Sequence, residues 1–172
     1  MRDEITKLYA QVDDVSKIID QLTTELVEQY CSQLNLYMKH IDKRLVESET
    51  GNPLIDTEVE TFILNLASIL YFTGSAMESL GIKEDACKAI RSELYNKTRE
   101  ATQGTVADKD AAATLACQYE TITLGVYSRS YRKVKLRIDA GYEMVSALKK
   151  VLTRRIAELE LSNSRYIGKE GV

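Results

Sequence analysis

Residues that interrupt helices are scarce in this chain. Its 172 residues include one proline and eight glycines, and tryptophan is absent. So few breakers in a chain of this length predict long, uninterrupted helices. The three cysteines, Cys31, Cys87 and Cys117, are too few and too widely spaced for a disulfide framework, so we expect buried thiols. His40 is the single histidine, and without paired cysteines it suggests no transition-metal site.

Long hydrophobic runs are also lacking. The longest apolar segment, Phe62 to Phe72, is broken by Asn65 and Ser68 and is shorter than the roughly 18 residues that span a bilayer. The charged N-terminus has no signal-peptide core. Charged residues make up 28% of the chain and hydrophobic residues 44%, which is enough for a buried core. These features predict a soluble, cytoplasmic protein that does not bind a membrane.

Catalytic motifs are missing as well. The sequence has no glycine-rich phosphate loop, no nucleophile elbow and no recognisable triad. An all-helical, magnesium-dependent nucleotide pyrophosphohydrolase is the enzyme alternative, because Glu25 and Glu28 lie one helical turn apart. A second acidic pair on a facing apolar helix is absent, and Asp108 and Asp110 fit better as helix-start acids. We therefore predict a protein that is not an enzyme and needs no metal or cofactor.

What the chain does have is helical periodicity. Residues 2 to about 46 predict one long helix whose apolar residues recur every three or four positions, as in a coiled-coil seam. The first members of this stripe are Ile5, Leu8, Val12, Val15, Ile19, Leu22 and Leu26. At about 1.5 Å per residue such a helix is about 70 Å long. It cannot cover this stripe by itself, so it needs a partner helix.

The rest of the chain predicts a shorter helical pair and a second long helix. A loop over 47–56 leads to helices at about 57–80 and 83–102, with Gly81 as the cap between them. The first of the pair is apolar over more than one face and should lie at the centre of the core. A long basic helix follows over about 106–162, and residues 163–172 are expected to be a flexible tail. The apolar stripe of this basic helix comprises Leu115, Tyr119, Ile122, Val126, Ser130, Val134, Ile138, Gly141, Val145, Leu148, Leu152, Ile156 and Leu159.

Together these patterns predict an all-α fold, a single helical domain over residues 1–162. Stripes this long are hard to cover within one chain, so we expect a homo-oligomer of the coiled-coil or helical-bundle type. The residues predicted at the oligomer interface are Leu8, Val12, Val15, Ile19, Leu22, Leu26, Val145 and Leu152.

The net charge of −3 hides a strong asymmetry. Residues 1–60 carry 13 acids and 6 bases, a net of −7, whereas residues 129–155 carry nine bases and two acids, a net of +7. The bases are Arg129, Arg132, Lys133, Lys135, Arg137, Lys149, Lys150, Arg154 and Arg155. They form either a solvated face that pairs with acidic helices or an electrostatic footprint for a polyanion.

Tyrosines are interleaved with the bases of this region, namely Tyr119, Tyr127, Tyr131 and Tyr142. Tyr127 and Tyr131 are four residues apart and would share a helix face, which Lys135 continues one turn later. Aromatic rings beside cations can stack on unpaired bases of a single-stranded nucleic acid. Tyrosines at helical spacing can equally belong to a core, because they bury a large area.

A family resemblance rests on residues 88–140. A basic helix with Tyr95 precedes a polar linker, Ala107-Asp108-Lys109-Asp110, and then a long helix. The residues that carry the resemblance are Arg91, Tyr95, Lys97, Arg99, Gln118, Tyr119, Ile122, Tyr127, Tyr131, Lys135 and Arg137. This region resembles the phage recombination mediators of the UvsY type. The chain as a whole is also similar to uncharacterised helical proteins of tailed phages.

The resemblance implies a function. Mediators of this type are small helical proteins that form rings, bind single-stranded DNA and help a RecA-like recombinase displace the single-strand-binding protein. It therefore implies a DNA recombination or replication accessory protein, in the host cytoplasm if phage-encoded, with a recombinase or single-strand-binding protein as partner. The bases of 129–155 would grip phosphates and Tyr127 and Tyr131 would stack. The alternative is a helical adaptor or inhibitor that binds a protein and no nucleic acid.

Overall fold

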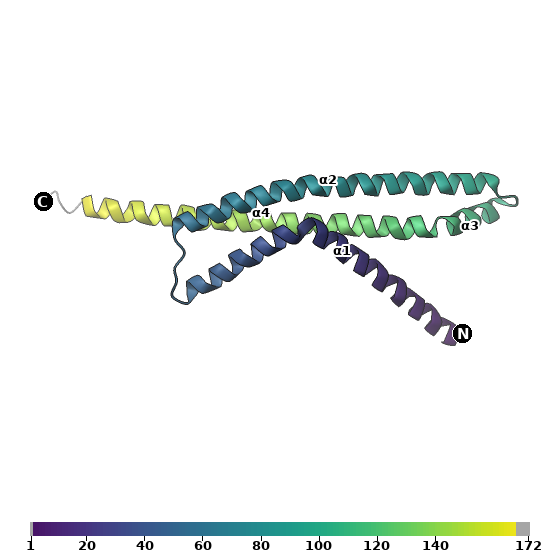
Figure 1. The fold of residues 1–172 in the computed structure, drawn as a ribbon, viewed down its shortest axis with the longest axis horizontal. Coiled ribbons are helices and arrows are strands. Elements are labelled where there is room, and N and C mark those ends of the chain that lie inside the picture. The colour runs from purple at the N-terminus through teal and green to yellow at the C-terminus, as the bar shows by residue number, and fades with distance from the viewer. Residues whose placement is uncertain (1, 168–172) are drawn as a thin grey trace. The chain divides into compact units, whose positions relative to one another are not determined.

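The computed structural model describes residues 2–167, and the side chains of residues 9, 10 and 12–162. The described chain consists of four α-helices and contains no strand (Figure 1). These are α1 (Arg2–Glu49), α2 (Asp56–Ala101), α3 (Val106–Ala116) and α4 (Gln118–Ile167). The all-α prediction is confirmed. Residues 163–167, expected in a flexible tail, continue helix α4, and the remaining tail residues 168–172 lie outside the described part.

The chain divides into two compact units. Unit 1 comprises residues 1–31 and 75–135, and unit 2 comprises residues 32–74 and 136–172. Each unit therefore takes one segment from each of the three long helices, and unit 1 also contains α3. Because segments distant in sequence make up each unit, neither can form from a continuous stretch of chain.

Helix α2 runs through the position where we predicted a break. The pair 57–80 and 83–102 is one helix of 46 residues, and Gly81 is not a cap. A Cβ placed on Gly81 would lie 3.6 Å from Cε2 of Tyr131 on α4, an ordinary packing distance. Leu80 and Cys87 are buried on either side of Gly81. This packing holds the helix together and outweighs the roughly 1 kcal/mol that a glycine costs inside a helix.

The second long helix is interrupted, again against prediction. Helix α3 ends at Ala116 and α4 starts at Gln118, with Cys117 between them at φ −95° and ψ 16°. The thiol of Cys117 donates to the carbonyl oxygen of Arg91 on α2 at 3.5 Å, and the thiol of Cys87 donates to that of Glu120 at 3.6 Å. All three cysteines are buried, as predicted.

The break changes which residues of this region face inward. Ala113 and Cys117 are buried, whereas Leu115 and Tyr119 of the predicted stripe are exposed. Beyond the break the stripe is confirmed as far as Leu148. Its buried members are Val126, Ser130, Val134, Ile138, Gly141, Val145 and Leu148.

Helix α3 begins at a complete capping box. The hydroxyl of Thr105 accepts a hydrogen bond from the backbone N–H of Asp108, and the Asp108 carboxylate accepts one from the Thr105 N–H. Gly104, at φ +129°, occupies the left-handed region just before the box. Asp110 then ties α3 to α2, because it accepts hydrogen bonds from Tyr95 at 3.2 Å and Arg99 at 2.7 Å.

In unit 2, two arginines hold the loop between α1 and α2. Arg44 on α1 donates to the Asn52 carbonyl at 2.9 Å and to the Glu58 carboxylate at 3.0 Å. Arg155 on α4 donates to the Leu54 carbonyl at 2.8 Å and to Asp56 at 3.0 Å. The loop and the first turn of α2 are thus attached to both other helices of the unit.

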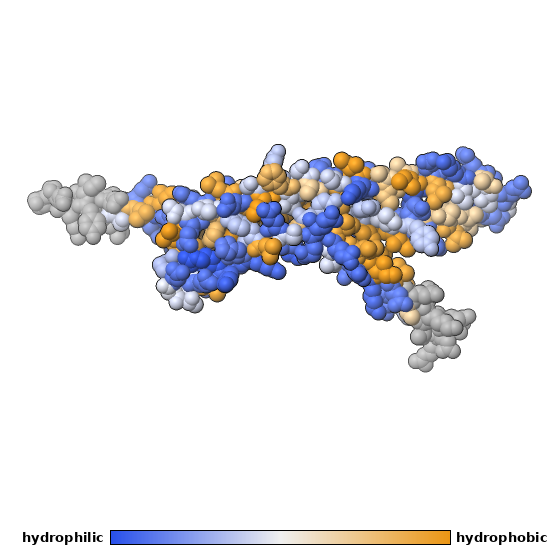
Figure 2. All heavy atoms as spheres, in the orientation of Figure 1, coloured by the Kyte–Doolittle hydropathy of each residue, from blue (hydrophilic) through white to orange (hydrophobic). Residues whose placement is uncertain are grey.

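Helix α2 is less enclosed than we predicted. Val59, Leu66, Leu70 and Leu80 are fully buried, but several large apolar side chains on the same helix are exposed. These are Leu64, Tyr71, Phe72, Ile82 and Ile90. Orange apolar side chains are visible among the blue ones on the surface in Figure 2. By length and composition alone α2 could cross a membrane, and 33% of its most apolar window is buried inside the protein.

Candidate polyanion-binding cleft

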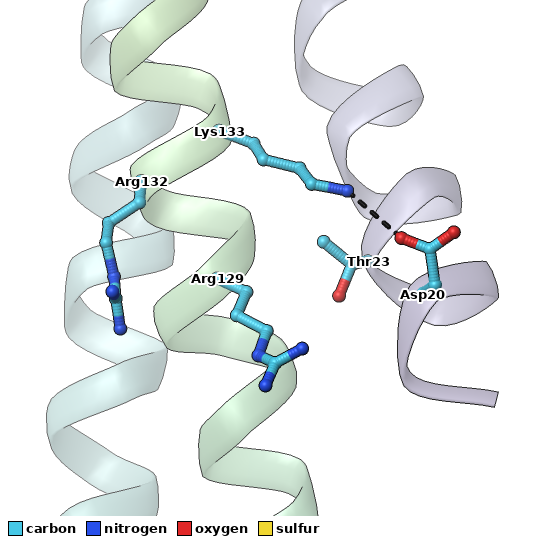
Figure 3. A pocket seen from close by; sticks show the side chains of 5 residues that line it. All are labelled: Asp20, Thr23, Arg129, Arg132 and Lys133. Carbon is cyan, nitrogen blue, oxygen red and sulfur yellow. Dashed lines mark hydrogen bonds and ion pairs between the residues drawn. The ribbon is translucent and has the colours of Figure 1, made fainter. Parts of the chain in front are cut away.

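A cationic cleft lies in unit 1, where α4 meets α1. It has a volume of about 220 Å³ and is lined by Arg129, Arg132 and Lys133 of α4 and by Asp20 and Thr23 of α1. Figure 3 shows Arg129 and Lys133 reaching from α4 toward α1, with Arg132 on the other side of α4 in this view. The three bases occupy one helical turn of α4, where positions three and four apart are neighbours.

The cleft has an excess of positive charge. Lys133 forms an ion pair with Asp20 at 3.2 Å, and Arg132 donates to the Ser128 hydroxyl at 3.2 Å. Arg129 makes no hydrogen bond or ion pair with the described residues and is exposed. Three bases against one acid leave a net charge of +2. A guanidinium presents several donors in a planar fork that matches phosphate oxygens, so the two arginines suit an anionic ligand.

One of the residues that line this cleft carries a buried hydroxyl. Thr23 is 1% exposed, and its Oγ1 has no hydrogen-bond partner among the described residues. Buried polar atoms are normally hydrogen-bonded, because an unsatisfied one costs about 1–3 kcal/mol. Ser130 Oγ, on the adjacent segment of α4, is buried and unsatisfied as well. Both oxygens are shielded from solvent, so neither is accessible to a ligand in this arrangement.

The other predicted bases are placed differently. Lys135 is exposed in unit 1, and Arg137, Lys149 and Lys150 are exposed in unit 2. Arg154 pairs with Glu158 along the surface of α4 at 2.8 Å. Arg155 is bonded to Leu54 and Asp56, so its guanidinium serves the structure and we withdraw it from the candidate binding residues.

The two predicted stacking residues do not line the cationic cleft. Tyr127 is half-buried in a different cleft, beside Leu22 and Glu25 of α1. Tyr131 is half-buried against α2, in an acidic cleft lined by Glu78, Glu84 and Asp85. Acidic neighbours repel a nucleic acid, so this placement does not support the stacking role that we expected for the pair.

The predicted oligomer interface is exposed over only part of its length. Val12, Val15 and Leu22 are exposed on α1, and Ile19 and Leu26 are half-buried. The side chain of Leu8 lies outside the described ones. Leu152 is half-buried, and Val145 is buried inside unit 2, where it packs within its own chain and offers no surface to another copy.

Part of the cleft could not be recognised in the sequence. Asp20 and Thr23 line it, but Asp20 is 113 residues from its ion-pair partner, Lys133. The opposite charges of the N-terminal and C-terminal regions were the one available signal. The buried, unsatisfied hydroxyl of Thr23 becomes visible only when α1 is packed against α4.

No metal centre is formed by the described residues. No group of three or more histidine, cysteine, aspartate or glutamate side chains lies close enough to hold an ion there. His40 packs against aromatic rings instead, with ring centroids 6.0 Å from Tyr37 and 5.8 Å from Phe62. Glu25, from the acidic pair of the hydrolase alternative, accepts a hydrogen bond from Gln21 at 2.9 Å.

Comparison with protein-family models, with curated proteins and with solved structures finds no match for this chain.

Proposed function

We propose that this protein is a DNA recombination or replication accessory protein that binds the phosphate backbone of single-stranded DNA. The observation that carries the proposal is the cationic cleft, in which Arg129 and Arg132 accompany the paired Lys133. Cations that replace the counterions of phosphates provide affinity without reading bases. The UvsY-type resemblance supplies single strands as the substrate, the host cytoplasm as the location and a non-enzymatic role.

The test is the salt dependence of binding to a labelled single-stranded oligonucleotide, measured by fluorescence anisotropy. On a single strand, each phosphate that a cation neutralises adds about 0.7 to the slope of log affinity against log salt. The variant Arg129→Glu with Arg132→Glu should therefore lower the slope by about 1.4 or more. Its matched control is Lys88→Glu with Lys97→Glu, which makes the same charge change on α2, where both lysines pair with acids.

The outcomes separate the possible ligands. An unchanged slope in the Arg129→Glu, Arg132→Glu variant would contradict the proposal. Equal weakening in the control variant would show that only net charge matters, and would also contradict a role for this cleft. If the wild type ignores DNA at low salt and captures an acidic helical protein, the bases serve protein pairing, as the alternative interpretation of the sequence holds.

A second candidate function is a helical adaptor that binds a protein partner, and an exposed apolar surface in unit 2 favours it. Leu64, Tyr71 and Phe72 are 69%, 73% and 66% exposed on α2, and the two rings pack edge to face at 5.5 Å. Large exposed apolar patches often mark interaction sites. This alternative is an adaptor or inhibitor that binds a protein and no nucleic acid, whereas a recombinase or single-strand-binding protein is the partner that the resemblance implies for the DNA-binding protein. In a pull-down, binding of a protein partner to this surface should survive high salt and be abolished by Leu64→Asp with Phe72→Asp.

A further inference from the structure

The face of α1 that packs inside unit 1 is not the face that carries the apolar stripe. Thr23, Val27 and Cys31 are buried. Leu22 directly precedes Thr23, and Leu26 directly precedes Val27. In a helix of 3.6 residues per turn, neighbouring side chains point about 100° apart around the helix axis. The contacts that bury Thr23 and Val27 therefore cover the stripe only in part: Ile19 and Leu26 are half-buried, and the rest of its described members are exposed.

The uncovered stripe is large and apolar. Val12, Val15 and Leu22 are 52%, 41% and 43% exposed, and Ile18, which flanks the stripe, is 55% exposed. Two open clefts run beside them. One, of about 670 Å³, lies between Val15 and Ile122 on α4, and the other, of about 350 Å³, lies between Leu22 and Val126. These volumes hold several side chains, so a further helix can supply what fills them.

Most charged residues of α1 lie away from the stripe, which suits pairing with a second copy that carries the same charges. Ser16, Ile18, Thr23 and Glu25 flank the seam, whereas the charged residues Asp13, Asp14, Lys17 and Asp20 lie on the outer positions of the heptad. Asp14 and Lys17 pair with each other at 3.9 Å, and Asp20 faces Lys133. Glu25 is thus the one charged residue that flanks the seam between residues 12 and 26, so two acidic α1 helices can approach there with little repulsion between like charges.

The spacing of the stripe is also self-complementary. When two copies run antiparallel about a two-fold axis near Lys17, Val12 lies opposite Leu22 of the second copy and Val15 lies opposite Ile19 of the second copy. In each facing pair the two residue numbers add to 34, so a single register brings all the pairs together. A two-fold interface requires this kind of self-complementary surface.

We propose that two copies of this chain dimerise through an antiparallel pairing of α1, with residues 12–26 of each helix covering the stripe of the other. Each incoming helix also lies beside Ile122 of the chain that receives it. Since α1 is already helical, pairing does not have to order it. This inference stands apart from DNA binding, because Val12, Val15 and Leu22 lie outside the cationic cleft.

Mass measurement of the full-length protein provides the first test. Sedimentation equilibrium should give twice the 19.4 kDa chain mass for the wild type and one chain mass for Val15→Asp with Leu22→Asp. The control is Ala10→Asp with Thr24→Asp, which adds the same charge to the outer side of α1 and should remain dimeric. A wild type that stays monomeric, or a stripe variant that stays dimeric, would overturn the proposal.

Spin-label distances test the register and do not depend on the folding of the aspartate variants. Labels are attached to Lys17→Cys, Ala10→Cys and Thr24→Cys in separate samples, with the unmodified protein as the control for its buried cysteines. The inter-copy distance should be shortest at position 17. A label at position 10 or 24 lies seven residues from the two-fold axis. The labels of the two copies are then displaced from each other by about 21 Å along the helix direction. Equal distances at all three positions would indicate parallel pairing and overturn the proposal.

Discussion

Gly141 of α4 lies so close to Leu70 of α2 that a Cβ on Gly141 would come within 2.6 Å of Leu70 Cδ2. Leu70 is fully buried in unit 2, so it has little space into which it can retreat. The absence of a side chain at Gly141 therefore allows the two helices to approach closely. A larger residue at position 141 would push α2 and α4 apart, which offsets the cost of a glycine inside a helix.

Gly141→Ala is expected to destabilise the protein by about 1 kcal/mol. Overpacking in a core costs about 1–3 kcal/mol, and the better helix propensity of alanine returns up to about 1 kcal/mol. The measurement is chemical unfolding followed by circular dichroism. Gly74→Ala, on α2 in the same unit, has no atom within 4 Å of the added Cβ and should instead be stabilising. The same sign of change in both variants would contradict this account of Gly141.

Arg155→Ala should destabilise the protein more than Arg154→Ala does. The Arg155 guanidinium bonds the Leu54 carbonyl and the Asp56 carboxylate, and with both partners partly exposed we expect a loss of about 1–2 kcal/mol. Arg154 pairs with Glu158 on an exposed surface, and Arg154→Ala should cost less than about 0.5 kcal/mol. Urea denaturation of both variants compares the two, and equal losses would remove the structural role assigned to Arg155.

Much of the fold could be predicted because the sequence contains so few helix breakers. The start of α1, the loop within 47–56 and the helix start at 106 agree with the ranges predicted from local signals. Positions where tertiary contacts decide could not be predicted. Nothing near Cys117 is a breaker, yet the chain breaks there beside the contact with Arg91, whereas Gly81 looks like a cap and is held in a helix.

The candidate site was predictable only in its charge. The cluster of bases in α4 follows from composition, but which bases are available depends on the other helices. Arg155 is occupied by the loop before α2, and Lys133 by Asp20. Helical spacing put Tyr127 and Tyr131 on one face without revealing what lies opposite. The acids Glu78 and Glu84 come from α2, far away in sequence.

Two carboxylates should make the fold sensitive to acid. Hydrogen bonds from Arg44 and the Ile55 backbone hold the pKa of Glu58 below its ordinary value, and those from Thr105 do the same to the pKa of Asp108. A lowered pKa in the folded state means that the ionised form stabilises the fold. This contribution is complete above the pKa of the unfolded chain, about 4, and is lost as the pH falls through the folded value.

The variants Glu58→Gln and Asp108→Asn test this contribution. Each should be less stable than the wild type at pH 7, and the difference should shrink as the pH is lowered below about 4. Urea midpoints recorded across this pH range provide the comparison. Glu60→Gln is the control, since Glu60 is exposed and makes no ion pair or hydrogen bond with the described residues. A difference that does not change with pH would show that shape, and not ionisation, is what Glu58 and Asp108 contribute.

Replacing either tyrosine should leave DNA affinity almost unchanged if the cleft binds phosphates alone. Base stacking on an aromatic ring is worth about 1–3 kcal/mol per base, a loss of about 5- to 150-fold when the ring is removed. Tyr127 and Tyr131 line clefts other than the cationic one, so Tyr127→Leu and Tyr131→Leu should each shift the dissociation constant less than about twofold. An abasic strand separates the two modes directly, because it keeps every phosphate and has no base to stack. Equal affinity of the wild type for abasic and ordinary strands is the result that phosphate binding requires. A strong preference for the strand with bases, abolished in one of the leucine variants, would mean that the tyrosine leaves its cleft to meet the DNA.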